Sequence, residues 1–120
     1  MFLGGGLGAF SRYQLGAWLA DRWPVVPWGT ALINISGSLL IGLFMVTSFH
    51  LKWSPDWRPF FAVGVLGGYT TFSSFSYEAM GLVEQGSFGW ALGYVLFNVL
   101  LSLGGCWLGI AVARALVGAA

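Results

Sequence analysis

Four long apolar segments, separated by three short polar loops, leave this chain few folds to choose from. The segments cover about residues 2–20, 28–49, 60–85 and 88–113. A helix of about 20 apolar residues crosses the ~30 Å hydrocarbon core of a bilayer. Only 8% of the residues are charged, against roughly 25% in a soluble domain. We therefore predict an all-α membrane protein, in which residues 1–120 form a single domain of four transmembrane helices.

The scarcity of charged and metal-binding side chains argues against several functions. A net charge of +1 provides no basic patch, so we expect no nucleic-acid partner. No cluster of His, Cys, Asp and Glu in the sequence suits zinc, and the single histidine, His50, has no evident partners for a catalytic triad. We predict that the protein is not an enzyme. No basic region precedes the first apolar segment, so we expect that segment to be retained rather than cleaved as a signal peptide.

The third segment contains residues that are poor material for the middle of a membrane helix. Residues 67–76 read Gly-Gly-Tyr-Thr-Thr-Phe-Ser-Ser-Phe-Ser. Glycine loosens the backbone, and hydroxyl groups bond main-chain atoms that leave the helical ladder. Backbone freed at membrane depth has to be buried in protein, line a wet path or bind an ion. We predict that Gly67-Gly68 and Thr70-Thr71 break the third helix mid-membrane. A serine- and glycine-rich packing face is the alternative that composition leaves open.

Two uncharged segments each carry a stripe of polar side chains at helical spacing. The second segment has Thr30, Asn34 and Ser38, and the fourth has Tyr94, Asn98 and Ser102. Residues four apart share one face of a helix. Hydrogen bonds between helices explain either stripe alone, but two stripes together favour a hydrated track.

Four further side chains have both an ordinary and a functional interpretation. Arg12 lies ten residues into the first segment, where it either extends to the headgroups or faces a wet vestibule. Phe72 and Phe75 either pack or face lipid, or they offer the positive edges of their rings to an anion. Glu78, one turn beyond Phe75, is protonated, paired or exposed to water.

These motifs resemble those of the small fluoride-exporting channels of the Fluc or CrcB family. The resemblance is carried by residues 5–13 (GGLGAFSRY), by Gly29 and Thr30 with Asn34, by Gly37 and Ser38, and by residues 67–76. Their order and spacing cover nearly the whole chain. The last of these motifs is specific, whereas the fourth segment matches only loosely.

The resemblance implies a channel that lets fluoride leave the cell passively, which lowers cytoplasmic fluoride and gives fluoride resistance. It implies a multi-pass protein of the plasma (inner) membrane, assembled as an antiparallel homodimer of dual topology with two pores. A structural sodium ion at the dimer interface would take carbonyl groups from Gly67 and Thr70. Asn34 would donate to fluoride, Phe72 and Phe75 would form an aromatic box, and Arg12 would line the vestibule. The remaining pore candidates are Ser74, Tyr94, Asn98 and Ser102, with Thr30, Ser38, Thr71 and Glu78 as further members of the polar track.

Two other functions remain open at this point. A small multidrug-type cation transporter is also a four-helix dimer of dual topology, but it would want a carboxylate deep in the first segment, where this chain has Arg12. A non-transporting assembly subunit would use the glycine stripes for packing alone. The loops on the side of the termini hold Lys52, Arg58 and Arg114 against Arg22 on the other side. This weak bias permits insertion in either orientation.

Overall fold

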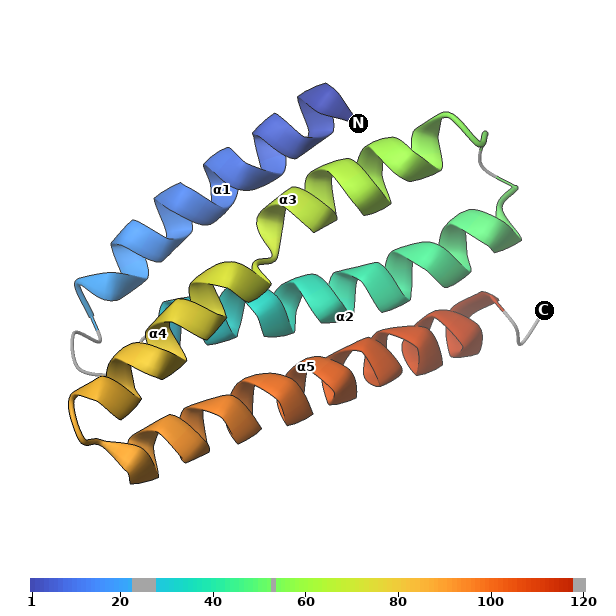
Figure 1. The fold of residues 1–120 in the computed structure, drawn as a ribbon. Helices are drawn as coiled ribbons and strands as arrows, with labels where there is room; N and C mark the ends of the chain where they lie inside the picture. Colours follow the sequence, from blue (N-terminus) through green and yellow to red (C-terminus); the bar gives the residue numbers. More distant parts are fainter. Residues whose placement is uncertain (23–27, 53, 118–120) are drawn as a thin grey trace.

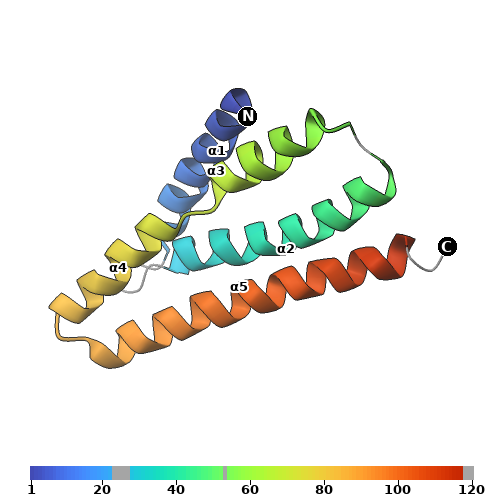
Figure 2. The same ribbon diagram turned by 45° about the vertical axis from the view of Figure 1, so that its right-hand side comes forward.

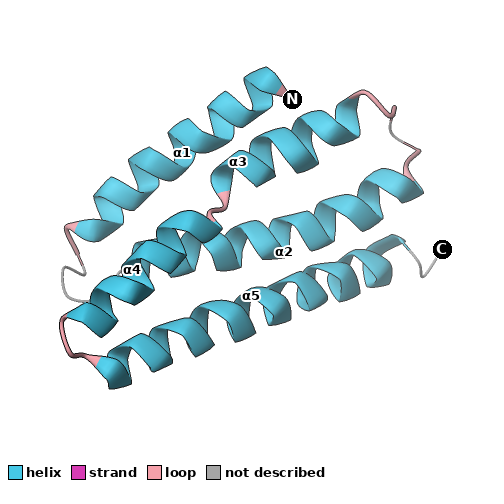
Figure 3. Cartoon of the chain, in the orientation of Figure 1, coloured by secondary structure: helices cyan, strands magenta, loops and turns pink. Residues whose placement is uncertain are grey.

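The computed structural model describes residues 1–22, 28–52 and 54–117, which contain helices and no strand (Figure 3). The elements are α1 (Phe2–Ala20), α2 (Trp28–His50), the π-helix η1 (Pro59–Leu66), α3 (Gly67–Tyr69), α4 (Phe72–Glu84) and α5 (Phe88–Val117). The chain runs four times along a body of 51 × 31 × 20 Å, and α1 begins at the end of the molecule where α5 finishes (Figures 1 and 2). The predicted all-helical fold is confirmed.

The helix boundaries follow the apolar segments closely. α1 has the predicted limits, and α2 is one residue longer than predicted. α5 continues through Arg114 to Val117, because a basic side chain in the last turn suits the negative end of a helix. The tryptophan and two prolines of the first predicted loop, at positions 23, 24 and 27, lie outside the described residues, as does position 53.

Two helices of the described part, α2 and α5, are long and apolar enough to cross a membrane by length and composition. The third pass is divided among η1, α3 and α4, the longest of which has 13 residues. None of these three helices is long enough to cross a membrane by itself.

The connection between α4 and α5 is a tight turn at Gly86. Gly86 has a φ of +80°, a conformation that glycine adopts without steric cost. Its N–H donates to the carbonyl of Val83, and the N–H of Ser87 donates to the carbonyl of Leu82, both at 2.9 Å. This paired ending is the Schellman motif, which satisfies two of the last carbonyls of α4.

Two extended residues separate α3 from α4 (Figure 1). Thr70 has φ −80° and ψ 156°, and Thr71 has φ −149° and ψ 121°. Gly67, in contrast, has ordinary helical angles of φ −65° and ψ −37°. The prediction that Gly67-Gly68 leave the helix is therefore wrong. These glycines stay helical, and a Cβ at Gly68 would lie 2.6 Å from the carbonyl oxygen of Gly5, so Gly68 instead permits close packing against α1.

Glycines also bring the other helix pairs into close contact. A Cβ at Gly109 on α5 would overlap the carbonyl oxygen of Leu39 on α2, and one at Gly42 would overlap the carbonyl oxygen of Cys106. Small residues allow this approach of two backbones in membrane proteins. Gly89 and Gly93, which lie four residues apart on α5, have no neighbour of this kind within 4 Å in the described part of the chain.

Candidate functional site

A single side-chain amide holds the extended residues between α3 and α4. The N–H of Thr71 donates to Oδ1 of Asn34 at 2.8 Å, and Nδ2 of Asn34 donates to the Thr71 carbonyl at 2.9 Å. In a continuous helix the N–H of Thr71 would reach the carbonyl of Gly67. Asn34, buried on α2, thus gives the N–H of Thr71 the acceptor that a continuous helix would have supplied, and it adds a donor to the Thr71 carbonyl.

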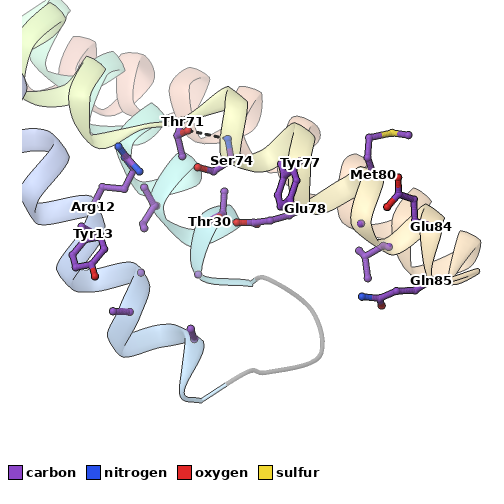
Figure 4. A pocket seen from close by; sticks show the side chains of 17 residues that line it. Arg12, Tyr13, Thr30, Thr71, Ser74, Tyr77, Glu78, Met80, Glu84 and Gln85 are labelled. Carbon is purple, nitrogen blue, oxygen red and sulfur yellow. Dashed lines mark hydrogen bonds between the residues drawn. The ribbon is translucent and has the colours of Figure 1, made fainter.

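The restart of the helix after the interruption has a local cause. Thr71 is the N-cap of α4, and its Oγ1 accepts a hydrogen bond from the N–H of Ser74 at 3.1 Å (Figure 4). A threonine side chain at this position satisfies one of the free N–H groups of the first turn. On the other side, Oγ1 of Thr70 donates to the carbonyl of Leu66 at 3.1 Å and closes the end of α3.

A pocket of about 360 Å³, called here the small pocket, lies beside the interruption. Its lining includes these predicted site residues: Asn34, Ser38, Gly67, Thr70, Thr71, Phe72, Phe75, Asn98 and Ser102. Asn98 is only 4% exposed. Its Nδ2 atom and the Oγ atom of Ser102 are buried, and neither has a hydrogen-bond partner among the described residues.

The two predicted phenylalanines of the aromatic box lie together but in different environments. Their ring centroids are 5.4 Å apart, and Phe75 continues the row to Tyr94 at 5.5 Å. Phe75 is 6% exposed, whereas Phe72 is 75% exposed. Within one chain, therefore, only Phe75 is enclosed, and Phe72 presents its ring to whatever covers this face.

A larger cleft of about 1010 Å³, called here the large cleft, opens on the other side of the interruption (Figure 4). Arg12, Thr30, Ser74 and Glu78 line it, and Thr71 lines both the cleft and the small pocket. Figure 4 shows the side chain of Arg12 reaching from α1 toward the start of α4. Its Nε donates to the carbonyl of Gly68 at 3.2 Å, close to the end of α3, where a positive charge is favourable.

Glu78 is held by two hydroxyl groups from different helices. Thr30 on α2 donates to Oε1 at 2.8 Å, and Tyr94 on α5 donates to Oε2 at 2.9 Å. Both carboxyl oxygens of Glu78 therefore have hydroxyl partners, and the side chain lies at the large cleft. Because the proton of Tyr94 goes to Glu78, this tyrosine offers only its oxygen lone pairs to the side of the polar stripe.

The two residues predicted to bind a cation, Gly67 and Thr70, lie at the interruption of the third pass. Hard cations take oxygen ligands such as backbone carbonyls. The carbonyl of Gly67 has lost the amide of Thr71 to Asn34, and both Gly67 and Thr70 line the small pocket. No group of three or more His, Cys, Asp and Glu in the described residues could hold a metal ion, so carbonyl oxygens are the donors that this region offers.

Sequence reasoning missed one hydroxyl pair close to the site. Ser36 on α2 and Tyr69 on α3 are 3.0 Å apart through their side-chain oxygens. Ser36 is two residues from Asn34 and therefore lies on a different face of α2 from the predicted stripe. The spacing of polar residues could not predict this contact, because Ser36 and Tyr69 are far apart in the sequence and meet only when the third pass packs against α2.

Comparisons with known proteins agree with the motifs of the sequence. Residues 1–110 match the family described as "CrcB-like protein, Camphor Resistance (CrcB)". A protein of Rhizobium meliloti named "Fluoride-specific ion channel FluC" is 44% identical over 116 residues, which cover 95% of this chain and 93% of that protein. Proteins of the same name are 45% identical in Rhodospirillum centenum (95% and 92% covered) and 46% identical in Thermus thermophilus (97% and 92% covered).

Proposed function

Because the chain belongs to the CrcB family, whose relatives carry the name of fluoride-specific ion channels, we propose that it conducts fluoride passively out of the cell. The family consists of membrane channels, so the chain is a membrane protein and not an enzyme. Passive export follows from the membrane potential, which is negative inside and drives an anion outward. At about 2.3 kcal/mol per charge for each 100 mV, this potential supplies the driving force without an energy-coupling motif.

The observation that carries the proposal is the pair of unsatisfied donors in the small pocket. The Nδ2 atom of Asn98 and the Oγ atom of Ser102 are buried beside Phe75 without partners in the described part of the chain. Leaving a buried donor unsatisfied costs about 1–3 kcal/mol. A small acceptor without protons of its own removes this cost, and the positive ring edge of Phe75 adds a further contact for an anion. Fluoride fits because closely placed donors replace its water.

The large cleft supplies the approach to this pocket. Arg12 is the cationic residue among those that line the cleft, whose lining also includes the carboxylates of Glu78 and Glu84. Its positive charge raises the concentration of anions in its immediate neighbourhood. Ser74 and Thr30 add hydroxyl groups along the cleft, and Thr71 lies between the two cavities. In the proposed path, fluoride collects near Arg12, passes the interruption at Thr71 and reaches Asn98 and Ser102.

The proposal also covers the position of the chain in the membrane, its oligomeric state and a bound sodium ion. The interruption lies mid-membrane in a four-span protein of the plasma membrane, and two chains of opposite orientation form a dimer with two pores. The exposed ring of Phe72 and the exposed Gly67 support a second copy on this face. A sodium ion would take the carbonyls of Gly67 and Thr70 from both chains and act structurally; fluoride flux in exhaustively sodium-free buffer tests this.

The multidrug-type transporter is disfavoured by the same residues. Such a protein would bind cations through a carboxylate deep in the first helix, where this chain has Arg12. The carboxylate that the chain does have, Glu78, accepts hydroxyl groups on both oxygens and lies on α4.

The test is efflux of fluoride from liposomes that hold the purified protein. Vesicles are loaded with potassium fluoride, valinomycin carries the balancing potassium, and an electrode records released fluoride. We expect rapid release of fluoride and little release of chloride from matched vesicles. Ser48→Ala is the matched control, because Ser48 is a buried polar residue of α2 that donates to the carbonyl of Met45 in its own helix. No fluoride release by a folded protein, or equal release of chloride, would refute the proposal.

A further inference from the structure

We propose that Asn34 is a positioning residue, which fixes the orientation of the Asn98 amide and leaves the contact with fluoride to Asn98. This inference rests on the proposed fluoride conduction. It differs from the expectation of the sequence, in which Asn34 itself donates to fluoride. The geometry that carries it is a series of three amides, namely the Thr71 peptide, the Asn34 side chain and the Asn98 side chain.

The first link is set by the polarity of the backbone. An extended residue presents its own N–H and C=O to the same side, and Thr71 presents both to Asn34, at 2.8 and 2.9 Å. Only one orientation of the Asn34 amide satisfies them, with Oδ1 toward the N–H and Nδ2 toward the carbonyl. The opposite orientation would place two donors together and two acceptors together.

The second link follows from the donors that Asn34 has left. A side-chain amide carries two N–H groups. One of those on Asn34 is bonded to the Thr71 carbonyl, and the second faces Oδ1 of Asn98 in a longer contact of 3.5 Å. Asn34 therefore has no N–H to offer a ligand. Because Oδ1 of Asn98 is turned toward Asn34, its NH2 group points the other way.

The far end of the series is the donor that fluoride meets. Nδ2 of Asn98 is buried without a hydrogen-bond partner in the described residues, and Asn98 lines the small pocket beside Phe75 and Ser102. The Tyr94 oxygen is a neighbour of Asn98. Since the NH2 group carries two donors, at least one remains for an anion even when the other faces Tyr94.

The series explains why two asparagines are needed where one donor would serve. Without Asn34, the Asn98 amide has no fixed orientation and can turn its carbonyl oxygen into the pocket. That oxygen carries negative partial charge and repels fluoride. The loss of one hydrogen bond to a charged group corresponds to roughly a 10- to 100-fold weaker interaction.

The experiment measures the rate of fluoride efflux from liposomes over a range of fluoride concentrations. It compares Asn34→Ala, Asn98→Ala and the double variant, with Ser48→Ala as the control. We expect each single variant to raise the half-saturating fluoride concentration by about 10- to 100-fold. We expect the double variant to resemble the more severe single variant, because both changes disable one donor. If the double variant raised the half-saturating fluoride concentration by the product of the two single effects, the inference would be overturned, since Asn34 would then contact fluoride independently.

A rescue variant separates positioning from a merely structural role. A serine hydroxyl rotates freely and donates without a fixed orientation. In the Asn34→Ala background, Asn98→Ser should therefore lower the half-saturating concentration again by several-fold. No rescue, or a fall in maximal rate alone, would overturn the inference. If Asn34→Ala does not assemble by size-exclusion chromatography, Asn34→Ser takes its place, because its hydroxyl still offers an acceptor for the Thr71 amide. Absence of fluoride efflux by the unmodified protein would instead refute the proposed function.

Discussion

Gly8→Ala should weaken the fold by forcing α1 away from the third pass. A Cβ at Gly8 would overlap the carbonyl oxygen of Val65 and lie 2.8 Å from the backbone nitrogen of Tyr69. Both neighbours are backbone atoms, so no side chain can rotate to make room. Gly6→Ala is the matched control, because a Cβ at Gly6 on the same helix has nothing within 4 Å among the described residues.

The size of the effect follows from two opposing contributions. Alanine favours a helix over glycine by about 0.8–1.0 kcal/mol, and this gain applies to both variants. Overpacking costs about 1–3 kcal/mol and applies only at Gly8. The free energy of unfolding should therefore be about 1–3 kcal/mol lower for Gly8→Ala than for Gly6→Ala.

The assay is unfolding in mixed micelles, with increasing dodecyl sulfate and with tryptophan fluorescence as the signal. The difference between the two midpoints gives the difference in free energy, provided that the slopes of the two transitions agree. Equal stability of the two variants, or a more stable Gly8→Ala, would refute the close contact of α1 with Val65 and Tyr69.

Three further predictions concern the site and the assembly. Phe75→Ile should reduce fluoride efflux strongly while the protein still folds, because isoleucine keeps most of the apolar volume and lacks the positive ring edge; unchanged efflux would make Phe75 an ordinary packing residue. Thr30→Val should lower the free energy of unfolding by about 1–3 kcal/mol, since it removes one of the two hydroxyl donors of Glu78; a stability equal to that of the unmodified protein in the same micelles would contradict this. A reporter fused to the C-terminus should reveal both orientations in one membrane, and added lysines in the loop at 50–58 should impose one orientation and lower efflux; a single orientation of an active protein would exclude the antiparallel dimer.

The sequence predicted the parts of the fold that depend on local composition. The limits of α1 and the turn at Gly86 follow from hydropathy and from the conformational freedom of glycine. The sequence singled out Thr70 and Thr71, where the interruption lies, together with Gly67 and Gly68, which stay helical. It could not separate the two pairs, because the interruption also depends on Asn34, which is 37 residues away from Thr71 in the chain. Glycine and threonine composition alone could not tell which residues would leave the helix.

In the candidate site, too, the sequence pattern predicted which residues share a helix face but not which residues they contact. Helical spacing placed Thr30 and Asn34 on one face of α2, but they take part in different cavities, one beside Glu78 and the other beside Asn98. The spacing of Phe72 and Phe75 likewise gave no sign that one would be 75% exposed and the other 6%. These distinctions arise from packing between helices, which one chain's residue pattern does not encode. The predicted roles in sodium and fluoride binding stay predictions.

The two extended residues between α3 and α4 also separate two groups of packed helices. η1 and α3 pack against α1, whereas α4 packs against α5, and α2 contacts both groups. The residues on the two sides of the interruption thus belong to two packing groups, which share the continuous helices α2 and α5. The residue between the two groups is Thr71, whose backbone is held by Asn34. Local opening in proteins follows such cooperative units. The amides of the two packing groups should therefore exchange with solvent deuterium as two separate populations.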